Sequence, residues 1–431
     1  MSSRLAKPVV VLIFLSLLAT LVGALKFSSC EQSFWASPDQ YVHACYSDIP
    51  ALYGERELDD DRWSYSSTTN AVEYPVLTGT VMWFFARVIP SGENEMLNYY
   101  RVNQIFLAGL FVFIALIVYR IRPEFAYLSA IAPAAIASLY INWDLWAIAS
   151  MMLSIYWFDR KKYTHSALAI GISISTKFLP IFLLLPIALI LWRRNEIREL
   201  ARYLGITVAT FLLFNVPVML TTPEGWLRFY QLNFDRGEDW GSIWYALSSL
   251  GVNLGNTNFF AILTLAVAVL VISLLIFSTK ETVQLADVSF IVLALVMIAS
   301  KVYSPQYVLW LVPLAVIAMS HRKDLHAFWI WQIAEVIYHV AIWQHLATVT
   351  DAKFGLPLTG YALISLLRIA ACLYFVVVLI KKASRGGQFP HEFLFKSADS
   401  YPSPPHHSPR LGPAAKRRSY NPPVTEMPWP S

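Results

Sequence analysis

Hydrophobic residues in this chain occur in long uninterrupted runs, and polar residues gather in the segments between them. Runs of roughly 15–20 apolar residues approach the length that an α-helix needs to cross a bilayer. Because the runs are continuous and do not alternate with polar residues, they exclude a transmembrane β-barrel. The pattern predicts an all-α, polytopic membrane protein with about 11–12 transmembrane helices, some of them short or re-entrant.

Most apolar runs are predicted to cross the membrane once. These are residues 8–25, 102–119, 125–141, 145–158, 203–220, 259–278, 285–300, 307–319, 327–343 and 358–380. Residues 76–89 are predicted to form a juxtamembrane or re-entrant helix. Residues 166–192 are too short for two full spans of about 20 residues each. We therefore expect two short helices there, which meet at residues 176–180.

The orientation follows from five basic clusters, because basic loops favour the cytoplasmic side. The clusters are Arg120 with Arg122, residues 160–162, residues 193–202, residues 321–323 and residues 381–385. Placing all of them inside requires an odd number of crossings between the external loop, residues 45–79, and Arg120, so residues 76–89 do not span. It also requires an even number within residues 166–192. Both termini are then cytoplasmic, in a plasma-membrane protein.

Composition agrees with this class and divides the chain into two parts. Apolar residues make up 57% of the chain and charged residues 14%, against about 25% charged in soluble domains. The net charge of +5 reflects topology, and we expect no nucleic-acid partner. Residues 1–382 form the predicted membrane domain. Residues 383–431, rich in Pro, Ser and His, are predicted to be a disordered basic cytoplasmic tail.

The unusual polar motifs all fall on the predicted external side. They are residues 45–79, which follow the first span, residues 142–144 (NWD), Lys177, residues 233–241 and residues 301–306. The orientation was derived from basic clusters alone, so this shared placement is an independent observation. It predicts a single extracytoplasmic active site.

Carboxylates in the first loop are the candidate catalytic groups. Asp48 lies three residues after Cys45 and two before Pro50, in a constrained segment, although Asp also caps turns. Asp39 is a second candidate. Asp60 belongs to an acidic run, residues 59–61, whose alternative is a solvated loop.

Cations at external membrane depth suit a lipid phosphate, and we assign Lys177, Lys301 and Arg236 to donor-phosphate binding. The alternative is that they pair with external carboxylates. The predicted substrate-binding residues are Tyr74, Asn142, Asp144, Asp239, Trp240, Tyr303, Gln306 and His339. For Asp144 a helix-capping role is equally open, and most aromatic residues would form an interfacial belt.

Three cysteines are present, and two of them, Cys30 and Cys45, fall in the predicted first loop. An external loop permits a Cys30–Cys45 disulfide, and two free thiols are the alternative. Cysteines this far apart do not form a metal site, so we predict none.

Several motifs resemble the GT-C superfamily of polyprenyl-phosphate-sugar-dependent glycosyltransferases. They are CYSDIPALYG, VEYPVLTG, NWDLWAI, TKFLP, NFDRGEDWGSIWY and KVYSPQYVLWLVPL, in this order up to about Lys382. Within the superfamily the chain most resembles the actinobacterial glycosyltransferase 87 (DUF2029) group, which includes phosphatidylinositol mannoside mannosyltransferases. The resemblance implies a GT-C-like bundle with an extracytoplasmic first loop and a juxtamembrane helix.

The resemblance also implies a reaction. A sugar, typically mannose, would move from a polyprenyl-phosphate donor to an extracytoplasmic glycolipid or glycan, with inversion. The first-loop Asp of the family acts as general base, and Asp48 matches it most closely, while Asp39 is the rival. A histidine in the C-terminal half assists, for which His339 and His345 are candidates. No cofactor is implied with certainty, and the acidic run leaves a divalent metal open.

Two other functions fit the same topology. A transporter or flippase for a lipid-linked solute would need polar residues at the bilayer midplane and internal repeats, and we find no repeat. A non-catalytic envelope scaffold would not need Asp48.

Overall fold

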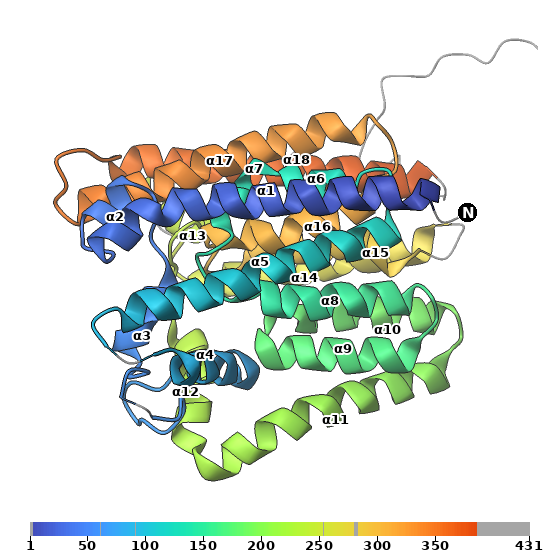
Figure 1. Cartoon of the computed structure of the whole chain (residues 1–431). Helices are drawn as coiled ribbons and strands as arrows, with labels where there is room; N and C mark the ends of the chain where they lie inside the picture. Colours follow the sequence, from blue (N-terminus) through green and yellow to red (C-terminus); the bar gives the residue numbers. More distant parts are fainter. Residues whose placement is uncertain (1–2, 61, 91, 253, 280–282, 386–431) are drawn as a thin grey trace, which may run out of the picture. The chain divides into compact units, whose positions relative to one another are not determined.

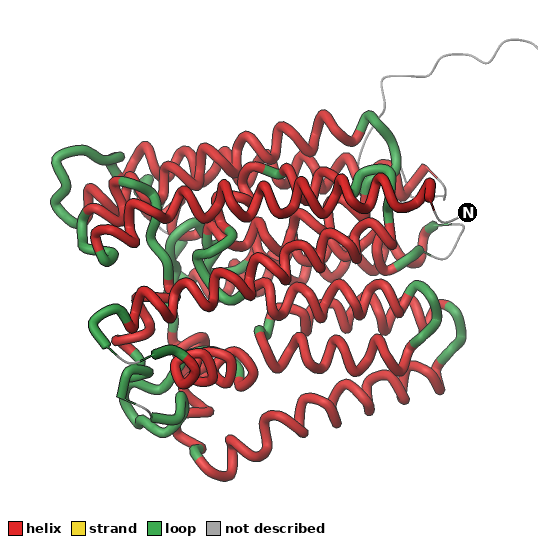
Figure 2. The backbone as a smooth tube through the Cα atoms, viewed as in Figure 1, coloured by secondary structure: helices red, strands yellow, loops and turns green. Residues whose placement is uncertain are grey.

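The computed structural model describes residues 3–60, 62–90, 92–252, 254–279 and 283–385. Over these residues it consists of helices and loops, without a strand, as Figure 2 shows. This confirms the predicted all-α class. Asp61 and residues 386–431, which hold nearly all of the predicted tail, lie outside the described residues. The last helix continues to Arg385, three residues past the predicted domain boundary.

Six helices in the described part of the chain are long and apolar enough to cross a membrane. They are α1 (Ser3–Ser33), α5 (Glu95–Ile121), α11 (Ile197–Thr221), α14 (Thr257–Ser278), α17 (Asp324–Val349) and α18 (Leu358–Arg385). With the composition, they establish a multi-pass membrane protein.

Shorter helices occur between the long ones along the chain. They are α4 (Val76–Val88), α8 (Asp144–Phe158), α9 (Tyr163–Thr176), α10 (Leu184–Arg193), α15 (Leu285–Ala299) and α16 (Val308–Ala318). At 1.5 Å per residue, helices of 10–15 residues span about 15–23 Å, less than a bilayer core of about 30 Å. Every residue of α16 is buried, so its apolar side chains face other helices.

One predicted span is not a continuous helix. Residues 125–141 form two short helices, α6 (Tyr127–Ile131) and α7 (Pro133–Ser138), instead of one. Proline disfavours the α conformation in the residue before it, and Ala132 has φ −63° and ψ 110°. Pro133 then begins α7, where its missing N–H costs nothing.

The predicted break within residues 166–192 is confirmed. Helix α9 ends at Thr176, and Lys177 is extended, with φ −144° and ψ 138°. A 3₁₀ turn, η1 (Leu179–Leu183), then leads into α10. The break places Lys177 in a non-helical segment.

The polar loops contain more helix than we predicted. The first loop holds α2 (Asp39–Val42) and α3 (Asp48–Glu55). Residues 221–258, predicted as loop, hold α12 (Pro223–Asp235) and α13 (Ile243–Ser249). Their starts have local signals that we overlooked, since Pro223 is the first residue of α12 and the Ser242 hydroxyl caps α13.

Polar loops and basic clusters occupy opposite ends of the helices. In Figure 1, α2, α3 and α12 lie at one end, and the N-terminus and the α8–α9 and α10–α11 connections lie at the other. At the second end Arg160 donates to the Arg120 carbonyl (2.9 Å), and Arg122 lies 3.4 Å from Asp287. The polar loops and the basic clusters, which the sequence predicted to lie on different sides, therefore do lie at different ends of the helices. Their assignment to the two sides of a membrane stays a prediction.

Candidate active site

A cavity of about 1120 Å³ opens at the end that holds α2, α3 and α12. Its wall comes from segments far apart in the chain. These are α3, the turns before α4 and α8, residues 177–182, α12 and η2 (Pro305–Tyr307). Asp48, Asn142 and Lys177 contribute polar groups to it, and Phe178 and Phe229 contribute apolar surface. It combines charged and apolar lining in one space.

Hydrogen bonds to backbone carbonyls hold these segments together. The Ser47 hydroxyl donates to the Tyr140 carbonyl (2.7 Å), and the Asp48 amide donates to the Ile141 carbonyl (2.8 Å). Both bonds align the start of α3 with the turn that precedes α8. Each bond gives a hydrogen-bond partner to a backbone group that has none within a helix.

A disulfide joins Cys30 and Cys45, as predicted, although Cys30 lies in α1 and not in the loop. The Trp35 indole also donates to the Cys45 carbonyl (3.2 Å). The segment that leads into Ser47 and Asp48 is therefore attached covalently to the end of α1. This limits how far Asp48 can move.

Four predicted site residues form one hydrogen-bonded chain in the cavity. The Asn142 Nδ2 donates to Asp48 Oδ2 (2.6 Å) and lies 2.9 Å from the Tyr74 hydroxyl. The Asn142 Oδ1 accepts from Lys177 Nζ (3.0 Å), and Lys177 Nζ lies 3.2 Å from Asp144 Oδ1. Lys177 also lies 3.9 Å from the centre of the Tyr74 ring. We call Asp48, Asn142, Lys177 and Asp144 the polar chain.

The environment of Asp48 suits proton transfer. Burial raises the pKa of its carboxyl above the ordinary value. Hydrogen bonds from Tyr46 and Asn142 and the charge of Lys177 oppose this rise, whereas Asp144 adds to it. Burial also holds the pKa of Tyr74 well above its usual range, so Tyr74 stays a neutral phenol.

Arg236, Trp240 and Gln306 line another part of the same cavity. Arg236 donates through Nε to Asp239 Oδ2 (2.9 Å), and its side chain is 42% exposed. Asp239 does not line the cavity, nor does Lys301, whose ammonium donates to the Arg236 carbonyl. Both are hydrogen-bonded to Arg236.

Other predicted site residues lie away from the cavity. Asp39 is exposed at the start of α2, and Asp60 is exposed 3.8 Å from Arg62. Tyr303 is buried under the Arg368 guanidinium, 3.6 Å from its ring centre.

The two candidate histidines are buried as well. The His339 Nε2 lies 3.0 Å from Lys26 Nζ, and the His345 Nδ1 lies 3.0 Å from the Leu356 carbonyl. Neither side chain lines the cavity.

The structure adds residues that we did not predict. Tyr41, Tyr46 and Trp343 line the cavity as a group of rings, with 5.4 Å between the Tyr46 and Trp343 centroids. Arg56 also lines it and donates to Glu73 Oε1 (2.8 Å). Arg56 lies eight residues after Asp48, so helical periodicity was a usable signal for it. Trp343 had no such signal, because it lies within an apolar run.

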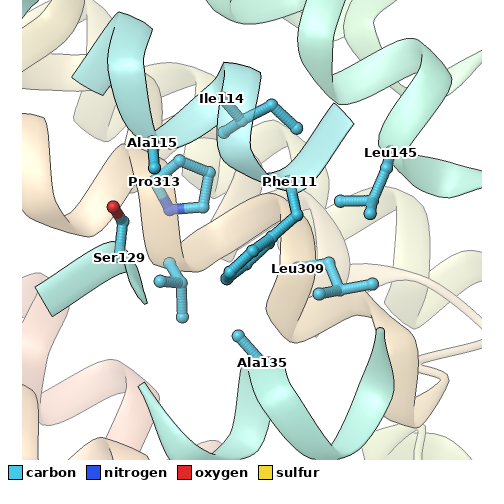
Figure 3. Close-up of a pocket in the computed structure, with 9 residues that line it drawn as sticks. Phe111, Ile114, Ala115, Ser129, Ala135, Leu145, Leu309 and Pro313 are labelled. Atoms are coloured by element: carbon cyan, nitrogen blue, oxygen red, sulfur yellow. The ribbon is translucent and has the colours of Figure 1, made fainter. Parts of the chain in front are cut away.

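Within the described residues, no three His, Cys, Asp or Glu side chains converge as a metal site. A second cavity, between α5, α8 and α16, is shown in Figure 3. It has a volume of only about 10 Å³ and is lined by apolar side chains such as Phe111 and Leu309. Its one hydroxyl, on Ser129, donates to the Ala126 carbonyl (2.6 Å). It offers no reactive group.

Comparisons with known proteins add little to this geometry. No family model and no curated protein matches the chain. Among solved structures, the chain is similar to the crystal structure of ArnT from Cupriavidus metallidurans bound to undecaprenyl phosphate. The identity is 15%, the match covers 88% of this chain and 77% of that chain, and the TM-score is 0.45. The proposals below therefore rest on the residues and geometry of this chain and on the resemblance of its motifs.

Proposed function

We propose that this protein is a GT-C-type membrane glycosyltransferase that takes its sugar from a polyprenyl-phosphate donor. The observation that carries the proposal is the cavity around Asp48. It combines a carboxyl of raised pKa, cationic side chains and an apolar wall in one space at the polar-loop end of the helices. A lipid-linked sugar phosphate needs all three, because it has a hydrophobic tail, a charged group and a reacting centre.

In the proposed mechanism, Asp48 is the general base. It removes the proton from an acceptor hydroxyl while the hydroxyl oxygen attacks the anomeric carbon of the donor sugar. The bond from that carbon to the phosphate oxygen breaks, and its electron pair leaves with the phosphate. The products are the glycoside, polyprenyl phosphate and a protonated Asp48, which returns its proton to water. A raised pKa helps, because a base is most effective when its pKa approaches the working pH.

This single displacement inverts the anomeric centre, since no covalent intermediate forms. A β-linked mannosyl donor would give an α-linked product. We propose mannose as the sugar and an external glycolipid or glycan as the acceptor, from the resemblance to the glycosyltransferase 87 group. We also propose that the cavity faces outward from the plasma membrane, with both termini in the cytoplasm. The proposed partners are therefore the donor, the acceptor and the bilayer.

The polar cavity favours an enzyme over the transporter alternative. A transporter needs its polar site at mid-membrane depth, reachable from both sides. Here the polar chain lines a cavity that α3 and α12 also border, and these two helices lie at the same end of the molecule in Figure 1. This placement suits chemistry at one membrane surface.

The test is transfer of radiolabel from polyprenyl-phosphate-mannose to a membrane glycolipid fraction by the full chain. Asp48→Asn keeps the shape of the side chain and removes its basicity, so we expect transfer to fall by about 10²–10⁴-fold. Asp60→Asn is the matched control, because Asp60 is exposed outside the cavity. Equal transfer by wild type and Asp48→Asn would remove Asp48 as the base. Absence of transfer by the wild type from this donor and from other polyprenyl-phosphate sugars would contradict the proposed function.

A further inference from the structure

The partners of Lys177 show how its ammonium group is used. An ammonium group has three N–H donors. Its oxygen partners are Asn142 Oδ1 at 3.0 Å and Asp144 Oδ1 at 3.2 Å. The Tyr74 ring lies 3.9 Å from Nζ, at cation–π distance. Its hydrogen-bonding capacity is thus directed at the protein before any ligand enters the cavity.

Lys177 and the Trp143 amide together determine which way the Asn142 amide faces, because both donate to its Oδ1. In the observed orientation Asn142 accepts from Lys177 through Oδ1 and donates to Asp48 through Nδ2. Turning the amide over would place its NH₂ group against the ammonium and its oxygen against the Asp48 carboxylate. Donor would then face donor and acceptor would face acceptor, and the Trp143 N–H would lose its acceptor, so Lys177 and Trp143 both oppose this orientation. Asp144 in turn holds Lys177 in place.

Arg236 differs from Lys177 in what it leaves available. Its Nε and one terminal nitrogen contact the same Asp239 oxygen. A guanidinium carries five N–H donors in a planar fork that matches phosphate oxygens. The Arg236 side chain is 42% exposed, whereas that of Lys177 is 14% exposed. Arg236 is therefore the cavity cation better placed to contact an incoming anion.

We propose that Lys177 is a positioning residue that, with Asp144, orients Asn142 and through it the base Asp48, and that the donor phosphate is bound at Arg236. The inference rests on the proposed function. It separates two cations that residue type alone places in the same role. Lys177 then acts on the base, and Arg236 acts on the substrate.

The charges around Asp48 make the inference testable by pH. Groups that influence its surroundings come from several elements, and they are Tyr41, Tyr46, Glu55, Glu73, Tyr74, Asp144, Lys177 and Tyr307. Lys177 lowers the pKa of Asp48 and Asp144 raises it. Because the base must be ionised, transfer rises with pH through the pKa of Asp48. Removing Lys177 should move that rise to higher pH, and neutralising Asp144 should move it to lower pH.

The experiment measures transfer by the full-length protein in lipid nanodiscs as a function of pH and donor concentration. For Lys177→Met we expect kcat to fall at least about tenfold at neutral pH, while the donor KM changes less than about threefold. The acidic limb of the pH profile, which is the rise of transfer with pH as Asp48 ionises, should move up by about one pH unit. Asp144→Asn should move it down. Arg236→Met should raise the donor KM about tenfold or more and leave the limb in place.

Lys353→Met is the control for loss of an external cation, because Lys353 is exposed on the α17–α18 loop. It should match the wild type. If Lys177→Met raises the donor KM as Arg236→Met does, without moving the limb, Lys177 is a phosphate ligand and the inference is wrong. Retention of the wild-type elution volume from a size-exclusion column shows that a variant is folded.

A second readout does not depend on transfer. Infrared titration of protein labelled with ¹³C-aspartate, taken as the difference between each protein and its Asp48→Asn counterpart, follows the Asp48 carboxyl directly. We expect it to titrate at higher pH in Lys177→Met and at lower pH in Asp144→Asn. The same titration in all three proteins would overturn the inference. Because a wild type without transfer contradicts only the proposed function, the two failures are distinguishable.

Discussion

Two charged clusters in this protein have similar chemistry and different surroundings. In one, Arg368 of α18 donates through Nε to Glu335 of α17 (2.8 Å), and the two side chains are 0% and 1% exposed. In the other, Lys177 lies 3.2 Å from Asp144 and lines the large cavity. The first is enclosed by protein, and the second borders the space where we place the substrates.

The two clusters differ in the partners of their remaining N–H donors. Arg368 also donates to the carbonyls of Tyr303 (2.6 Å) and Ser304 (3.1 Å). These carbonyls belong to the non-helical segment before η2, whose Pro305 and Gln306 line the cavity. Backbone without helical bonds needs such partners inside a membrane protein. The fully satisfied buried pair therefore supports the cavity wall, whereas we propose that the charged chain that reaches the cavity serves the reaction.

The largest effect is expected when one partner of the enclosed Arg368–Glu335 pair is removed. Arg368→Met should destabilise the protein by about 3–5 kcal/mol, because it leaves a buried Glu335 charge and two carbonyls unpaired. Thermal unfolding in nanodiscs measures the loss. The double variant Glu335→Met with Arg368→Met should recover part of it, since no buried charge remains. An unchanged unfolding temperature in Arg368→Met would contradict a structural role.

The disulfide offers a smaller test of how firmly the base is held. Replacing Cys30 and Cys45 by Ser opens a loop with a sequence separation of 15 residues. The expected loss of stability is about 3 kcal/mol, from the entropy that the unfolded chain regains. Cys372→Ala is the matched control, because Cys372 is a buried free cysteine away from the site. If reduction with dithiothreitol leaves both stability and transfer unchanged, the link does not hold the segment before Asp48.

The smallest effects are expected at the acidic residues outside the cavity. Asp39→Asn and Asp60→Asn should change transfer by less than about twofold and stability by less than about 0.5 kcal/mol, because both side chains are exposed. Initial rates and unfolding temperatures check this. A large loss of transfer in either variant would show that the cavity around Asp48 is not the whole site.

Much of the protein could be predicted from local sequence. Continuous apolar runs predict helices and a membrane environment, since neither property depends on distant residues. Basic clusters predicted which connections share an end, and the Thr-Lys-Phe-Leu-Pro segment predicted the break at Lys177. Residue type together with predicted external position identified Asp48, Asn142 and Lys177 as candidates. Pro133 itself signals the split between α6 and α7, but the long apolar run around it led us to predict one continuous helix.

Tertiary structure decided which candidates work together. Asp48 and Asn142 are hydrogen-bonded although 94 residues separate them in the sequence, and 35 residues separate Lys177 from Asn142. Asp39 and Asp60 had the same chemistry in the same loop, yet packing left them outside the cavity. Local patterns determine helices because backbone hydrogen bonds are local. Contacts between distant segments depend on how the helices pack, and no single segment of the sequence contains that information.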